Sequence, residues 1–282
     1  MRCSAFLRVF GLWAALLLAD PGSVLAQTRE IVQLKGDVYR FIDNNHASIF
    51  VITGQGVVMT DPISLPAAQW LRHEVGQLTD QPITHLIFSH SHADHASGGS
   101  AFGRGLTVIA QQNAPASIDG VAPTVRFDST YQFALGSKTF ELTALGPGHG
   151  EDLLALIVRP ENVLFVVDAV AAKRLPYRDF PGLDIAQLQQ QIKRVQALNF
   201  ELMAPGHGNT GGPEDVDGQA LYVERLAERV SEAIARGLNG DALVQAVPMT
   251  EYVHWSRYRD WHALNIKGMA RWLMLKPRKT NP

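Results

Sequence analysis

A dense group of metal-binding residue types stands at residues 84–99, THLIFSHSHADHASGG, where three histidines and an aspartate fall within six residues. His90 and His92 are two residues apart, so both imidazoles could reach one metal ion from a tight loop. Asp94 and His95 are adjacent and would point elsewhere, which would let the same loop serve a second ion. Packing these groups at one strand end costs desolvation that only metal or hydrogen bonding offsets. The cluster therefore predicts a metal site.

Three further candidate ligands follow at the ends of predicted strands: His149 in LGPGHGEDLL, Asp168 in FVVDAV and His207 in MAPGHGNTGG. The glycines beside both histidines allow sharp turns that bring a ring close to an ion. Imidazoles and carboxylates without sulfur suit Zn²⁺ first, with iron or manganese as alternatives. We therefore expect two zinc ions per chain.

The elements that must position these residues follow two similar patterns. The first half predicts strands, a helix and a strand that runs into the histidine cluster, at residues 30–34, 37–42, 47–53, 56–61, 66–79 and 83–88. The second half repeats this order with strands, a helix and a strand before His207, at residues 124–128, 131–135, 138–145, 153–159, 162–168, 185–198 and 200–205. Two β-rich halves with helices outside predict an α/β fold, a four-layer αβ/βα sandwich.

The cluster itself should open a helix that continues through ASGGSAF at residues 96–102. Residues 213–282 are expected to be mostly helical, with long helices at 220–235 and 258–275. No linker rich in proline, glycine or serine interrupts the chain. We therefore predict a single domain at residues 27–282 with extra C-terminal helices.

Residues 1–26 have the features of a cleaved signal peptide. Arg2 and Arg8 flank an apolar run, VFGLWAALLLA, and VLA at residues 24–26 offers a cleavage site. An uncleaved anchor is the alternative, but the run is shorter than the ~20 apolar residues of a membrane span. We expect a periplasmic or secreted protein that begins near Gln27 and is not stably inserted in a membrane. The one cysteine, Cys3, lies in this segment, so the mature chain would have no thiol ligand or disulfide.

The overall charge limits the class of partner. The chain has 282 residues, a formal net charge of −2 and 46% hydrophobic residues, which is ordinary for a globular protein. Without a broad basic field, nothing attracts nucleic-acid phosphates. The expected partner is a small-molecule substrate, and the sequence does not indicate an oligomeric state.

The motif HSHADH resembles the HxHxDH signature of the metallo-β-lactamase superfamily, and the resemblance extends over residues 38–209. The remaining histidines and the aspartate occur in the order of the family's ligands. The resemblance implies a first ion held by His90, His92 and His149, a second held by Asp94, His95 and His207, and a bridge formed by Asp168. It also implies an αβ/βα fold, in agreement with the element pattern.

The resemblance implies hydrolysis of an ester, thioester, lactone or amide by a metal-bridging hydroxide, with Asp94 as the catalytic residue that orients it and relays its proton. β-Lactam hydrolysis is an alternative. It is disfavoured because zinc β-lactamases with three histidines at the first site usually lack the bridging aspartate, and another group has cysteine in the second site. A mononuclear iron oxygenase of the persulfide dioxygenase type and a catalytically silent metal-binding protein remain as alternatives from other classes.

Several other residues could support the site. Asp61, in VVMTDP, could orient the metal loop or cap a turn, and Lys173, Arg174 and Tyr177 could bind a substrate anion or an oxyanion or belong to a solvated loop. We expect His46, in DNNHAS, in a surface turn, although the corresponding region borders the site in relatives. Structural roles are expected for His73, His85, His254 and His262, and for Trp255, Trp261 and Trp272 in packing the C-terminal helices, although a covering helix could place one tryptophan at the pocket.

Overall fold

The structure, a computed structural model, describes residues 28–275, so the predicted signal peptide lies outside the described residues. The first sheet has seven strands in the order of the chain: β1 (Arg29–Lys35), β2 (Val38–Asp43), β3 (His46–Thr53), β4 (Gly56–Thr60), β5 (Ile83–Ile87), β6 (Thr107–Gln111) and β7 (Val125–Phe127). The second has five strands in the order β12-β11-β10-β9-β8: β8 (Thr130–Leu135), β9 (Lys138–Ala144), β10 (Leu154–Arg159), β11 (Val163–Val166) and β12 (Leu202–Pro205).

The first sheet is buried on both faces. Its first four strands form an antiparallel meander, and β4 to β7 run parallel. Along β4, Val57 and Met59 pack with helix α1 (Leu65–Leu78), whereas Val58 joins the core shared with the second sheet. This alternation follows from side chains pointing to opposite faces of a strand.

The second sheet lies between the first sheet and another layer of helices. Strands β10 and β11 are buried at nearly every position, as expected when both faces are covered. Helix α3 (Ile185–Gln196) packs its buried side into the same core and contacts α4 (Pro213–Ala235). The predicted four-layer αβ/βα sandwich is confirmed.

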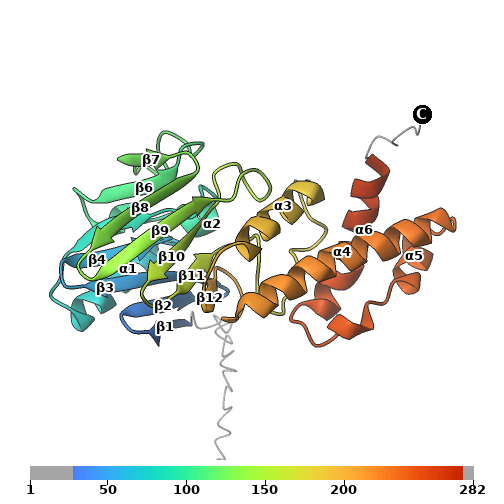
Figure 1. The fold of residues 1–282 in the computed structure, drawn as a ribbon, viewed down its shortest axis with the longest axis horizontal. Helices are drawn as coiled ribbons and strands as arrows, with labels where there is room; N and C mark the ends of the chain where they lie inside the picture. The colour runs from blue at the N-terminus through green and yellow to red at the C-terminus, as the bar shows by residue number, and fades with distance from the viewer. Residues whose placement is uncertain (1–27, 276–282) are drawn as a thin grey trace, which may run out of the picture.

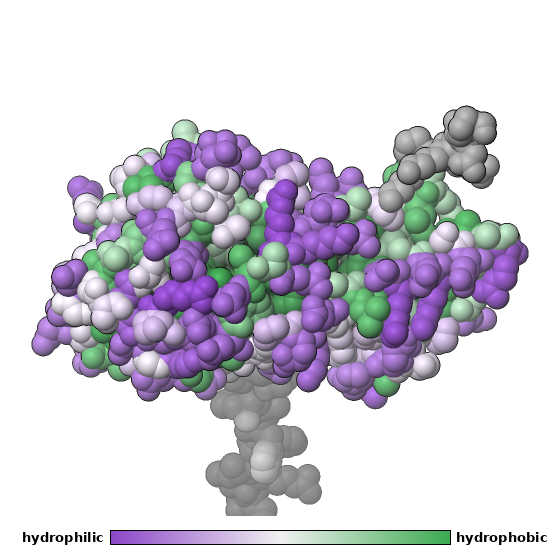
Figure 2. Space-filling view, in the orientation of Figure 1, coloured by the Kyte–Doolittle hydropathy of each residue, from purple (hydrophilic) through white to green (hydrophobic). Residues whose placement is uncertain are grey.

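The C-terminal helices form a bundle beside the sandwich (Figure 1). Helix α4 packs against α6 (Tyr258–Leu275), with α5 (Gly240–Ala246) and the short helix η2 (Thr250–Tyr252) between them in the chain. The aromatic rings of Tyr222, Tyr252 and Trp255 fill the space between these elements. Within the described residues, no helix combines the length and apolar character of a membrane span. Figure 2 shows mostly hydrophilic residues along the visible side of α4.

The secondary structure differs from the prediction at four points. Strand β6 and helix α5 were not predicted, and α4 begins at Pro213, seven residues before the expected start at residue 220. The helix of the histidine cluster, α2 (Ala93–Ala96), ends before Ser97 and does not continue to residue 102. The chain turns there because Gly98 has φ +92° and a Cβ at this position would collide with the Leu65 backbone. A separate 3₁₀ helix, η1 (Gly99–Phe102), follows.

Candidate metal centre and substrate pocket

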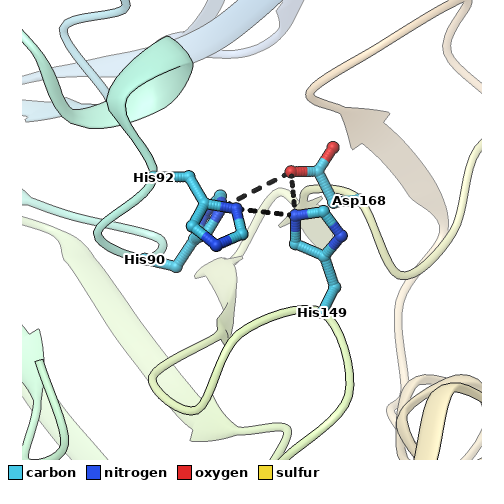
Figure 3. Close-up of side chains that lie close together, drawn as sticks. All are labelled: His90, His92, His149 and Asp168. Carbon is cyan, nitrogen blue, oxygen red and sulfur yellow. Dashed lines mark hydrogen bonds and ion pairs between the residues drawn. The ribbon is translucent and has the colours of Figure 1, made fainter. Parts of the chain in front are cut away.

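The candidate ligands meet at one edge of the sandwich, where loops from both sheets converge. A first cluster contains His90, His92, His149 and Asp168, whose ligand atoms all lie within 4.8 Å of one another (Figure 3). Asp168 Oδ2 lies 3.4 Å from His90 Nε2 and 3.1 Å from His149 Nε2. The loops after β5, β9 and β11 carry these residues.

A second cluster contains His95, His207 and Asp168, again with ligand atoms within 4.8 Å of one another. His95 Nε2 lies 3.3 Å from His207 Nε2, and Asp168 Oδ1 lies 3.2 Å from His207 Nε2. Asp94 Oδ2 is 3.9 Å from His95 Nε2. Asp168 therefore belongs to both clusters and presents one carboxylate oxygen to His149 and the other to His207.

Several of these atoms lie 3.3–3.4 Å apart, which is longer than a typical hydrogen bond and fits ligands of a shared metal ion. Two ligands that each bind one tetrahedral ion at ~2.1 Å lie about 3.4 Å apart. His90 Nε2 is buried and has no hydrogen-bond partner, although buried polar atoms are almost always paired. His92 and His149 face each other through ring nitrogens 2.9 Å apart. An imidazole and carboxylate donor set without sulfur suits zinc.

Residues behind the clusters orient the rings. Asp61 Oδ2 lies 3.1 Å from His95 Nδ1, and the Asp61 carboxylate also accepts hydrogen bonds from the Ser89 amide and hydroxyl. His207 Nδ1 lies 2.8 Å from the Asn45 carbonyl oxygen, to which it can donate. In both histidines the bonded Nδ1 leaves Nε2 directed at the cluster. Such partners fix the tautomer and direction of a metal-binding ring.

The backbone at two ligand positions is shaped for close approach. Asp168 has φ +58°, a left-handed conformation that few residues other than glycine adopt and that is often found at functional sites. Gly206 precedes His207, and a Cβ there would lie 2.6 Å from Val167 Cγ1 and 2.8 Å from His95 Cε1. The absence of a side chain at residue 206 therefore allows the His207 loop to approach His95.

Burial and the contacts between clustered side chains have opposing effects on the pKa values of the candidate ligands. Burial lowers the pKa of His90. Burial alone would raise the pKa of Asp168, but the surrounding imidazoles hold it well below its usual value. Burial also opposes a charge on His95, yet the carboxylates of Asp168 and Asp61 raise its pKa to about 10. A metal ion that binds His95 must therefore displace a proton.

A pocket of about 510 Å³ opens onto both clusters. Its lining also includes Leu175, Pro176 and Tyr177 from the loop after Asp168, Leu183 before α3, and Trp261 of α6. Arg174 and Arg257 lie 4.9 and 5.5 Å from the Trp261 ring centroid. Arg257 pairs with Asp260, whereas Arg174 has no ion-pair or hydrogen-bond partner for its side chain among residues 28–275. Burial, followed by repulsion from Arg257, lowers the pKa of Arg174.

The structure brings together most of the residues predicted from the sequence. All seven predicted ligands belong to the two clusters or border them, and Asp61 contacts His95. Arg174 and Tyr177 line the pocket, but Lys173 lies in a neighbouring hollow. Of the tryptophans, Trp261 reaches the pocket, the role that the sequence left open as an alternative.

The preferred expectation for His46, a surface turn, is wrong, and the alternative that it borders the site holds. This residue begins β3, and its Nε2 atom lies 3.5 Å from Asp94 Oδ2. Contact with His46 is the main cause that lowers the pKa of Asp94. Arg257 was not considered from the sequence, because nothing in its local pattern distinguishes it from a surface arginine. Both residues reach the site through tertiary packing.

Known proteins resemble the chain in sequence and fold. The α subunit of 2,4-dinitroanisole O-demethylase from Nocardioides sp. (strain JS1661) is 26% identical over 184 residues, 62% of this chain and 56% of that protein. Thioesterase pkgB from Emericella nidulans is 23% identical over 226 residues, 77% of this chain and 54% of that protein. The matches to these two relatives thus span about half of the relatives' own length.

Among solved structures, a metallo-β-lactamase from Pontibacter korlensis superposes with a TM-score of 0.63 at 20% identity, over 70% of this chain and 99% of that chain. At this identity the likeness concerns the fold. The family model of the metallo-β-lactamase superfamily matches residues 42–207, which include all seven predicted ligands. Because that match covers more than half of the chain, the chain belongs to the metallo-β-lactamase superfamily.

Proposed function

We propose that the protein is a dinuclear zinc hydrolase that cleaves an ester, thioester, lactone or amide bond. The observation that carries the proposal is the position of Asp168, whose two oxygens lie 3.1 Å from His149 and 3.2 Å from His207. One carboxylate can therefore belong to both metal sites. Two divalent ions would supply a Lewis acid for the scissile carbonyl and lower the pKa of water toward ~7.

Asp94 is the residue of this chain that would accept the proton of the attacking water and pass it on. Its side chain is 54% exposed, lines the pocket and has a lowered pKa because of His46. An ionised carboxylate at this point can hold the attacking water by one oxygen and accept its proton there. The proton can then pass to the leaving group, which is the role of a general acid and base.

The pocket wall supports a substrate with an apolar body and an anionic group. Leu175, Leu183 and Trp261 offer apolar surface, and the Arg174 guanidinium, which lies over the Trp261 ring, has no ion-pair or hydrogen-bond partner in the described residues. Burial, and after it repulsion from Arg257, lowers the pKa of Arg174, and a bound anion would offset both effects. A carboxylate or phosphate on the substrate would fit this position, where arginine can form paired hydrogen bonds.

We also propose that the chain is exported and works in the periplasm or outside the cell. The support comes from the basic residues, the apolar run and the VLA site within residues 1–26. This location disfavours the persulfide dioxygenase alternative, because persulfide substrates of that type are intracellular.

The proposed function can be tested by metal analysis followed by a hydrolysis panel. Zinc-loaded protein should contain close to two metal equivalents and hydrolyse at least one class among thioesters, aryl esters, acyl-homoserine lactones and β-lactams. Removing the metal with a chelator should abolish the activity, and adding zinc back should restore it. A protein that retains one iron equivalent and consumes O₂ with a persulfide would overturn the proposal, and activity that survives complete metal removal would do the same.

A further inference from the structure

His46 is held beside the second cluster by the backbone on both of its sides. The Asn45 carbonyl oxygen lies 2.8 Å from His207 Nδ1, and the Ala47 amide donates to the Gly206 carbonyl oxygen at 2.8 Å. The residues before and after His46 are therefore bonded to the same loop that presents His207. These two bonds, one to the Gly206 backbone and one to the His207 ring, position residue 46 beside the loop without involving the His46 side chain.

The His46 ring faces the second cluster. Its Nε2 atom lies 3.5 Å from Asp94 Oδ2, and the ring meets His207 edge to face with centroids 4.8 Å apart. His46, Asp94 and His207 each offer one ligand atom, and these atoms lie within 4.8 Å of one another. The separation from Asp94 exceeds the ~2.9–3.0 Å typical of an N–H···O bond. This separation is closer to the 3.3 Å between His95 Nε2 and His207 Nε2, two of the ligands that the family resemblance implies.

We infer that His46 is an additional imidazole ligand of the ion that His207 holds. The inference rests on the proposed dinuclear site and adds a donor from a strand of the first sheet to donors that come from loops. The second ion would then have His46, Asp94, His95 and His207 as ligands besides the shared Asp168. Five protein donors exceed the four of a closed tetrahedral zinc site. The second site would therefore favour a five- or six-coordinate ion, whereas the first would keep three imidazoles and one carboxylate oxygen.

Metal titration of His46 variants tests the assignment. In competition with a chromophoric chelator, the wild type should bind two Zn²⁺ ions, and His46→Ala should weaken the second by at least tenfold while leaving the first unchanged. His46→Gln can still donate a hydrogen bond to Asp94 but provides no imidazole, so it should behave like His46→Ala. His73→Ala, which removes an exposed histidine on α1, is the matched control and should bind both ions as the wild type does.

A crystal structure of the zinc-loaded protein gives a second readout. His46 Nε2 should lie ~2.0–2.2 Å from the second ion, the range of Zn–N bonds. Two bound ions with His46 Nε2 beyond bonding distance, or full second-site affinity in His46→Gln, would overturn the inference and leave His46 as a partner of Asp94. A wild type that binds only one ion would overturn the dinuclear proposal and this inference together. The two failures are therefore distinguishable.

Discussion

Asp61 contacts His95 through a carboxylate–imidazole pair of 3.1 Å in which neither side chain is exposed. The same carboxylate accepts two hydrogen bonds from Ser89, the residue that precedes His90. One buried aspartate at the end of β4 thus sets the position of the histidine loop and the direction of the His95 ring. Ligand geometry in the second cluster depends on this residue, which lies outside the ligand set.

Replacing Asp61 with asparagine should weaken the second metal site. The amide removes the negative charge and presents an NH₂ group either to Ser89 or to His95, so one of these contacts is lost. Loss of such a partner typically lowers metal affinity by ~10- to 100-fold. Metal titration should show a weaker second equivalent, with Asp80→Asn on the exposed surface as the control. Unchanged affinity in Asp61→Asn would show that the pair does not position His95.

Asp94→Asn should separate metal binding from turnover. The asparagine keeps the size of the side chain and one oxygen but cannot accept a proton. We expect kcat to fall by ~10²–10⁴, as for loss of a general base, with a much smaller change in KM. The first equivalent of zinc, held by residues other than Asp94, should still bind. Near wild-type kcat with full metal content would mean that the ions have a structural role.

Arg174→Ala should raise KM for anionic substrates selectively. A hydrogen bond to a charged group contributes about 1.5–3 kcal/mol, which corresponds to a ~10- to 150-fold effect. A neutral ester of the same acyl group should be affected much less, and Arg174→Lys should recover part of the loss. Arg104→Ala, an exposed arginine distant in sequence, serves as the control. Equal losses for charged and neutral substrates would assign Arg174 a packing role against Trp261.

Asn265→Ala should destabilise the fold and disturb the pocket at the same time. Asn265 Oδ1 accepts a hydrogen bond from the buried Tyr222 hydroxyl at 2.7 Å, and its amide donates to the carbonyl oxygens of Pro176 and Arg178. Leaving these groups unpaired should cost about 2–4 kcal/mol of unfolding free energy. Tyr222→Phe should cost only about 1 kcal/mol. Urea unfolding measures the free energy of unfolding of both variants. A smaller loss in Asn265→Ala than in Tyr222→Phe would contradict the role of Asn265 in joining Tyr222 to the carbonyl oxygens of Pro176 and Arg178.

The export proposal predicts a shortened N-terminus. Material recovered from the periplasm or medium of a Gram-negative host should begin near Gln27, as determined by N-terminal sequencing. Changing the apolar run by Leu16→Arg should keep the protein in the cytoplasm with Met1 present, because charge in this region blocks recognition of a signal peptide. Wild-type protein that stays cytoplasmic with an intact N-terminus would contradict the proposal.

The sequence predicted the layers and the ligands for a clear physical reason. Strand alternation and helical periodicity are local patterns, and the grouping of His90 to His95 with two glycine-flanked histidines is chemically distinctive. The features that were missed depend on tertiary contacts. Gly98 ends α2 because the backbone of Leu65 lies against it. His46 reaches Asp94 only because the start of β3 is bonded to the loop after β12.

The hydrogen bond from the Ala47 amide to Gly206 joins the first sheet to the second at the edge that carries the ligands. The residues of the HSHADH motif come from the first sheet, and His149, Asp168 and His207 come from the second. Ions bound between them would hold the two halves of the chain together and add their binding free energy to folding. Removing the metal with a chelator should then increase hydrogen exchange at the amides between the two sheets, such as that of Ala47, before the amides within the strands exchange. Metal at this edge would therefore hold the two sheets of the sandwich together.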